Sequence, residues 1–247
     1  MRDRPVRNDG QTRKSDVLPF EAKDVHVALQ QGIKASASWE SAAQNVLGSS
    51  AQWIVAQCRE VQNPALTVHL GFGHAEGLLK GHRLQDYAVA IADSIKELSG
   101  VQFHSLRLSK HQGESTTVAI GEATDVGRPR GLRSVIMETR RSYATPAFGD
   151  EIRDQTASLG SVLVPNVPLG LQVSYVTGLP RTWSRLWKPT LSGIFVNPVD
   201  SSQVVDLLFD HWSVGDELGH SVRLTISAWR TSATGQRSKE STRRRTQ

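Results

Sequence analysis

Apolar residues recur at helical spacing in two stretches of the first half of the chain. Between Trp39 and Val61 they gather on one face, which predicts a helix that ends at Asn63-Pro64. The same spacing predicts a second helix over 83–98, stopped by Gly100. The strands expected around these helices lie at 66–70, 101–108 and 116–120.

The second half repeats this order of elements. The elements expected there are a helix over 150–159, a strand over 171–175, a helix over 186–194, and strands over 204–210 and 222–226. The matched positions are Leu66 with Leu171, Ile95 with Ile194, and Ile120 with Ile226. We therefore predict an α+β protein of two tandem units that form a pseudo-dimer, in which one chain takes the place of a two-fold dimer. Two unrelated α+β segments that share an order are the alternative.

Composition divides the chain into five segments. Residues 1–16 and 233–247 are polar and lack hydrophobic periodicity, so both are expected to be disordered tails. A break rich in Gly, Pro and Arg near the middle predicts a linker at 126–131. The two units are then 17–125 and 132–232.

The net charge of +5 is carried by the tails. Residues 1–16 contain five basic and three acidic groups, and residues 233–247 contain five basic groups and one acidic group. Setting these aside leaves a net charge of −1 for the body. Basic tails can neutralise phosphates, which favours nucleic acid as a partner. The alternative is that the tails are only solvated ends.

The remaining composition bears on the compartment. No apolar run approaches the ~18 residues that a membrane-spanning helix needs, so no membrane is expected as a partner. The charged N-terminus has no apolar stretch behind it and is unlike a secretory signal. Cys58, the single cysteine, falls on an apolar helical face and is expected to be a buried hydrophobe. These features favour a cytoplasmic protein.

Two segments of the second half resemble the RusA-type Holliday junction resolvases. Leu186-Trp-Lys-Pro-Thr-Leu-Ser-Gly-Ile194 is similar to the lysine-containing helix of that family, and Asp200-Ser-Ser-Gln-Val204 is similar to its Asp-Asp-Ser-Gln strand start. The resemblance implies a small α+β fold, a homodimer and Mg²⁺-dependent cleavage of branched DNA, as in DNA recombination and repair. It places Lys188 on the motif lysine and Asp200 on the first aspartate of the strand motif.

This sequence departs from the family pattern at the acidic positions. In the second half, Thr182 and Ser184 stand where the family has paired helix aspartates. In the first half, the segment 83–95 has the same frame and Asp93 falls on a motif aspartate, but Arg83 replaces an acidic residue. The other departures are Gln85, Asp86, Val89, Arg185 and Ser192. We therefore expect catalysis to be weakened or lost.

The candidate catalytic residues that the resemblance leaves are Lys188, Asp200, Asp93 and Asp86. Asp200 and Asp93 are the candidate metal ligands, and Mg²⁺ is the cofactor expected if the chain is catalytic. Cleavage would require these carboxylates, together with Asp206, to converge from different elements. The alternative is that they are ordinary surface carboxylates.

Basic and aromatic residues interleave just before and within the helix expected over 186–194. Arg181, Arg185 and Lys188 alternate with Trp183 and Trp187, a pattern typical of surfaces that bind phosphates and stack on bases. Tryptophans four residues apart can also belong to the core, and we expect this of one and leave the other open. The full set of candidate nucleic-acid contacts is Lys80, Arg83, Arg181, Arg185, Lys188, Arg243, Arg244 and Arg245.

Together these patterns predict a nucleic-acid-binding protein related to Holliday junction resolvases, with DNA as the expected partner. An active Mg²⁺-dependent structure-specific endonuclease and a non-catalytic protein-interaction module are the alternatives. The histidines match no established zinc spacing, and the Gly-rich segment 71–82 lacks a nucleotide-binding motif. The chain is expected to be a monomeric pseudo-dimer or a homodimer.

Overall fold

The computed structural model describes residues 22–29, 51–72, 82–113, 116–123, 133–178, 182–195 and 201–231, with 22–29 described as backbone alone. The elements of the first half are β1 (Ala22–Leu29), α2 (Ala51–Arg59), β2 (Pro64–Phe72), α3 (Leu84–Ser99), β3 (Ser105–Gln112) and β4 (Thr116–Glu122). The elements of the second half are β5 (Arg133–Thr139), α4 (Pro146–Thr156), the 3-10 turn η2 (Ala157–Ser161), β6 (Leu169–Thr177), α5 (Ser184–Ile194), β7 (Val204–Ser213), the 3-10 turn η3 (Gly215–Leu218) and β8 (Val222–Arg230).

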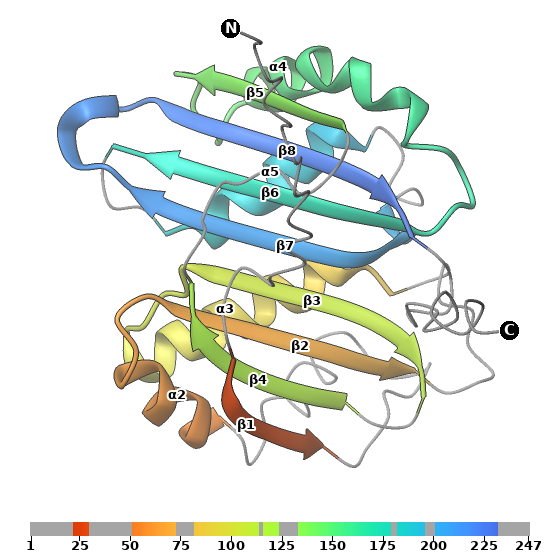
Figure 1. Cartoon of the computed structure of the whole chain (residues 1–247). Coiled ribbons are helices and arrows are strands. Elements are labelled where there is room, and N and C mark those ends of the chain that lie inside the picture. Colours follow the sequence, from red (N-terminus) through yellow and green to blue (C-terminus); the bar gives the residue numbers. More distant parts are fainter. Residues whose placement is uncertain are drawn as a thin grey trace, which may run out of the picture.

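The strands form one mixed sheet of eight strands in the order β1-β4-β2-β3-β7-β6-β8-β5. Helices α3 and α5 lie against the same face of this sheet, behind it in Figure 1. Each half contributes a parallel pair, β2 with β3 and β6 with β7, which the helix between the two strands connects. The order of strands reads the same from either edge when β1 is equated with β5, β2 with β6, β3 with β7 and β4 with β8.

The two halves meet where β3 and β7 pair antiparallel, and we call this pairing the seam. Ser105 to Ser109 lie opposite Asp210 to Asp206. Arg107 crosses the seam and donates two hydrogen bonds to Asp206, from Nε to Oδ1 at 2.9 Å and from Nη2 to Oδ2 at 2.8 Å. The sheet therefore runs without interruption from one half into the other.

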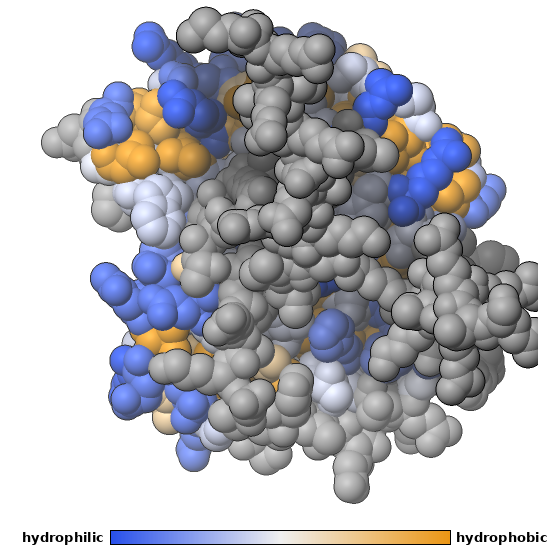
Figure 2. Space-filling model, in the orientation of Figure 1, coloured by the Kyte–Doolittle hydropathy of each residue, from blue (hydrophilic) through white to orange (hydrophobic). Residues whose placement is uncertain are grey.

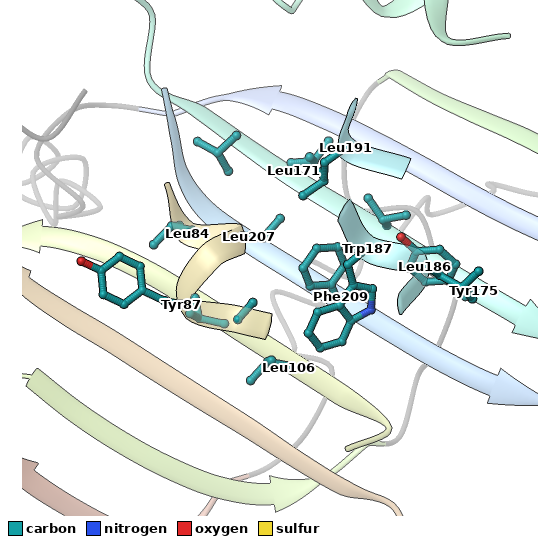
Figure 3. Close-up of a cluster of buried hydrophobic side chains, with 14 of the residues drawn as sticks. Leu84, Tyr87, Leu106, Leu171, Tyr175, Leu186, Trp187, Leu191, Leu207 and Phe209 are labelled. Carbon is teal, nitrogen blue, oxygen red and sulfur yellow. The ribbon is translucent and has the colours of Figure 1, made fainter. Parts of the chain in front are cut away.

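A single core lies between the sheet and its helices. The inward side chains of α3 recur at helical spacing, and Leu84, Tyr87 and Ile91 among them are fully buried. Figure 3 shows Leu84 and Tyr87 of α3 and Trp187 of α5 over the inward side chains of the central strands. Trp187 stacks on Phe209 of β7 with ring centroids 4.4 Å apart. Burying one such side chain stabilises the fold by roughly 1.5–3 kcal/mol.

Local signals explain where α3 ends. Gly100 adopts the left-handed conformation at φ 72°, and its N–H donates to Lys96 O at 2.7 Å. This closure satisfies a carbonyl of the last turn, and glycine adopts the conformation without strain. Between its two ends α3 carries the apolar stripe that the sequence predicts.

The structure confirms the central elements of both halves. The predicted segments 66–70, 83–98, 116–120, 171–175, 186–194, 204–210 and 222–226 lie within or closely match β2, α3, β4, β6, α5, β7 and β8. The mixed α+β class is likewise confirmed. Of the predicted helix from Trp39 to Val61, the part described is α2, and residues 39–50 lie outside the described residues. So do the predicted tails and linker.

Three details of the prediction are wrong. The strand expected at 101–108 begins at Ser105, because the residues before it lead in from α3 as irregular chain. The helix expected at 150–159 begins at Pro146 and tightens into η2 after Thr156. In the sheet, Val118 lies opposite Val68 and Ile226 lies opposite Val173, so Val118 corresponds to Ile226 where the sequence matches Ile120.

The surface of the described residues mixes both kinds of side chain. On the face seen in Figure 2, apolar residues form separate patches among hydrophilic ones. The large apolar side chains that are exposed are Leu98, Ile136 and Trp212. No helix in the described part of the chain is both long and apolar enough to cross a membrane.

Candidate nucleic-acid interface

The helices that carry the resolvase-like segments lie beside each other across the seam. Near the end of α3, Lys96 donates from Nζ to Thr182 Oγ1 at 2.7 Å, just before α5 begins. Ser184 Oγ, in the first turn of α5, donates to Asp93 Oδ1 at 2.7 Å. At the other end, Gln85 of α3 donates to Ser201 Oγ, after α5, at 3.4 Å. The two helices therefore run antiparallel.

Thr182 and Ser184 are the positions at which the resemblance expects paired aspartates. Their hydroxyls are used in contacts with Lys96 and Asp93 of α3, so these positions join the two helices. A neutral hydroxyl is also a much poorer ligand for Mg²⁺ than a carboxylate. These contacts give Thr182 and Ser184 a structural role in joining α5 to α3.

The structure does not bring the predicted carboxylates Asp86 and Asp93 together. They lie seven residues apart on α3, which is roughly 10 Å along a helix axis and too far to share an ion. Asp86 accepts a hydrogen bond from Arg83 at 2.8 Å, and Asp206 is engaged by Arg107. Within the described ranges no three His, Cys, Asp or Glu side chains are placed to hold a metal. The described residues do not fit a Mg²⁺ site, and Asp200 lies outside them.

Among the predicted basic contacts, α5 presents two that are exposed. Arg185 and Lys188 both face solvent and, three residues apart, lie on the same side of the helix. Arg83 is about two-fifths exposed and pairs with Asp86. The remaining candidates, Lys80, Arg181, Arg243, Arg244 and Arg245, lie outside the described residues.

Both tryptophans of the interleaved pattern belong to the core. Trp183 is 9% and Trp187 2% exposed. Trp183 stacks on His211 with ring centroids 4.3 Å apart, and Tyr175 stacks on the opposite side of the same imidazole at 4.8 Å. Neither indole is therefore available to stack on a base. The exposed aromatic of this region is Trp212, which the sequence pattern does not single out.

His211 is held as a neutral ring in this aromatic stack. Trp187 Nε1 donates to His211 Nε2 at 2.6 Å, so the ring proton is assigned to Nδ1, which is buried without a partner among the described residues. Burial, with a smaller contribution from neighbouring His104, holds the pKa of His211 well below 6.5. Burial also lowers the pKa of His104. A neutral, enclosed imidazole belongs to the core and offers no cation to a phosphate.

Lys110 is a polar residue of this helix-covered face that sequence reasoning missed. It follows Leu106 and Leu108 at alternate positions of β3, so its side chain points inward and is 4% exposed. Its Nζ donates to His82 O at 2.9 Å and to Ser202 O at 2.5 Å. Burial lowers its pKa to about 7. The detectable signal was a lysine on the apolar side of an alternating strand.

Comparison with known proteins does not assign the chain to a family. No family model matches the sequence, and no curated protein matches it.

Proposed function

We propose that this chain is a nucleic-acid-binding protein formed by tandem duplication of a resolvase-like unit, with metal-dependent cleavage weakened or lost. The observation that carries the proposal is the recurrence of element order and strand pairing on both sides of the seam. Each half has the order strand, helix, strand, helix, strand, strand. In the first half, β4 pairs with the edge strand β1 and with β2, and β2 also pairs with β3. In the second half, β8 pairs in the same way with the edge strand β5 and with β6, and β6 also pairs with β7.

The antiparallel seam supports the pseudo-dimer in particular. A two-fold axis through an antiparallel strand pair would exchange the two halves and place their equivalent helices beside each other. Contacts from Lys96 to Thr182 and from Ser184 to Asp93 join α3 to α5 in this way. A homodimer of single units would place its motif helices together by the same operation.

Exposed cations on α5 support a phosphate-binding surface. Arg185 and Lys188 form no ion pair within the described part of the chain, so both are available to a polyanion. Trp183, just before α5, stacks on the buried His211. This contact holds the start of α5 against the core, so Arg185 and Lys188 lie on the outer side of the helix. The arginine-rich tail would add phosphate contacts that do not depend on base sequence.

The proposal is tested by measuring binding to a four-way junction, a duplex and a single strand over a range of salt concentrations. Each phosphate contact contributes about 0.9 to the slope of log affinity against log salt for duplex DNA. Arg185→Ala and Lys188→Ala should each weaken binding and reduce the slope by about one. Arg59→Ala removes an exposed arginine from α2, away from α5, and is the matched control, with no change expected.

Two further arms separate the alternatives. Binding that disappears on deletion of residues 233–247, and that ignores Arg185 and Lys188, would leave the body as a protein-interaction module with a basic tail. Junction cleavage in Mg²⁺ that is abolished by Asp200→Asn would identify an active endonuclease. No affinity for any of the three nucleic acids at low salt would overturn the proposal.

A further inference from the structure

The buried lysine of β3 stands at a position where α/β sheets commonly bind ligands. Lys110 lies opposite Leu70 near the carboxyl ends of the parallel strands β2 and β3. Its Nζ donates to the carbonyl of His82, which lies two residues before α3 begins. Ligands of open α/β sheets bind in the crevice outside the carboxyl ends of parallel strands, close to the helix N-terminus.

The charge on Lys110 lacks a counter-ion among the described residues. Its two partners, His82 O and Ser202 O, are neutral carbonyls. An ammonium group has three donors, so one N–H has no partner in the described part of the chain. Burying a cation is costly unless an anion accompanies it.

The groups packed around this ammonium do not supply that anion. On the α3 side, Asp86 is neutralised by Arg83, and the His82 ring is hydrogen-bonded to Tyr87 Oη at 2.8 Å. On the β7 side, the turn contributes Ser201, which accepts from Gln85, and the Ser202 carbonyl. Leu70 of β2 and Leu108 of β3 are apolar. The described surroundings therefore carry a net positive charge.

The first turn of α3 adds to this positive potential. The helix is 16 residues long, and Arg83 at its N-cap makes no side-chain capping hydrogen bond. Free N–H groups and the helix dipole make such an end favourable for a negative charge. A buried ammonium beside the positive end of a long helix is unfavourable by itself, and a bound anion would relieve both.

We propose that Lys110 and the first turn of α3 bind the phosphate group of a phosphate monoester at the carboxyl ends of β2 and β3. Because Lys110 is only 4% exposed, Nζ is out of reach of a continuous duplex backbone, and the ligand expected by the proposal is a terminal phosphate or a small phosphorylated molecule. Both sources present the same anionic terminal phosphate oxygens. The site is separate from the α5 surface and stands without the proposed nucleic-acid function.

The first test follows thermal unfolding of the full chain against inorganic phosphate at pH 6 and constant ionic strength. Wild type should gain stability saturably, because a ligand that binds only the folded state raises the melting temperature. Lys110→Met keeps the length and removes the charge, and it should weaken apparent phosphate affinity by roughly tenfold or more. Arg59→Met is the matched control, because it removes an exposed cation of α2 that belongs to neither proposed binding surface, and it should respond as wild type does. An equal response in Lys110→Met and wild type overturns the site.

A second measurement needs no variant. Sulfate keeps its charge across the range, whereas Lys110 is neutral well above its pKa of about 7. Saturable stabilisation by sulfate should therefore be present at pH 6 and lost at pH 9. The general stabilisation by sulfate at high concentration is not saturable and is subtracted by reference to Lys110→Met. A saturable response of equal size at both pH values overturns the site.

Oligonucleotides with 5′-phosphate and 5′-hydroxyl ends distinguish the two sources. Tighter binding of the phosphorylated end in wild type, absent in Lys110→Met, identifies a nucleic-acid terminus. Equal binding of both ends with an intact phosphate response identifies a small phosphate ester. If the chain binds phosphate and no oligonucleotide, the nucleic-acid function fails and the anion site stands. If it binds oligonucleotides without any phosphate response, the anion site fails alone.

Discussion

Replacing Trp187 with phenylalanine tests the role of the aromatic stack around His211. The change keeps an aromatic ring against Phe209, at the present centroid distance of 4.4 Å, but removes the N–H that His211 Nε2 accepts at 2.6 Å. His211 is 1% exposed, so water cannot replace the lost donor. Its imidazole would then have both nitrogens buried without partners.

The expected cost combines two contributions. An unsatisfied buried acceptor costs about 1–3 kcal/mol, and the smaller ring leaves a void that costs about 1 kcal/mol more. We expect Trp187→Phe to lower the free energy of unfolding by roughly 2–4 kcal/mol. The matched control is Trp183→Phe, which keeps the stack on His211 and removes no hydrogen bond recorded in the described part of the chain. It should cost under about 1.5 kcal/mol.

Urea unfolding followed by far-UV circular dichroism at pH 7.5 measures both variants, since this signal comes mainly from the backbone and is retained when a tryptophan is replaced. The difference in midpoint multiplied by the common slope gives the change in free energy. The double variant Trp187→Phe with His211→Phe should recover part of the loss, because the orphaned acceptor is then removed. Equal destabilisation by Trp183→Phe and Trp187→Phe would refute the hydrogen-bond argument.

Four further changes have defined outcomes. The pKa of His211 in the folded protein lies well below 6.5, so as the pH falls below 6.5 the unfolded chain takes up a proton that the folded chain does not. This group should therefore lower the free energy of unfolding by up to about 1.4 kcal/mol per pH unit below pH 6.5. His211→Phe should flatten the curve of urea midpoint against pH. Folding lowers the pKa of Lys110 from 10.5 to about 7, so between these pH values the unfolded chain holds a proton that the folded chain has lost. The free energy of unfolding in anion-free buffer should therefore rise with pH between about 7 and 10.5. Urea titrations of Lys110→Met should lack this rise. A Cβ on Gly193 would lie 2.6 Å from Gly149 O, so Gly193→Ala should lower the melting temperature where α5 crosses α4, whereas Gly160→Ala, with open space, should leave it within a degree or so of wild type. Asp206→Asn should cost about 1–3 kcal/mol in urea unfolding by weakening its bonds to the mostly buried Arg107, and an unchanged midpoint would show that the seam does not depend on that pair.

The sequence predicts the interior of this fold better than its edges. Strands β2 and β6 place large apolar residues at every second position and are buried along almost their whole length, and α3 has an apolar stripe at helical spacing, so each has a signal of its own. The edge strands β1 and β5 were missed. In β5, most side chains are exposed and only Met137 and Thr139 are buried, so hydrophobic alternation is weak. Its strand character comes from pairing with β8, a contact that a local pattern does not contain.

The candidate site was harder to predict, because its chemistry depends on which side of each element faces the core. Trp183 and Trp187 could line a surface or fill the interior until the rotation of α5 is known, and packing on His211 and Phe209 decides it. Asp93 matches a motif aspartate in sequence, yet its partner is a serine from the other half. Lys110 was visible as an inward lysine, but its neighbours come from segments distant in the sequence.

The antiparallel direction of the two central strands places Lys110 and His211 at opposite ends of the sheet. Since β3 and β7 run in opposite senses, the carboxyl ends of the two parallel pairs open toward opposite poles. Lys110 lies near one pole and His211 near the other, separated along the strands by roughly 20 Å at 3.3 Å per residue. The two poles differ in character, because one holds the buried cation of Lys110 and the other holds His211 between stacked rings. A small ligand bound at Lys110 would therefore make no direct contact with the His211 stack, although both residues belong to neighbouring strands of one sheet.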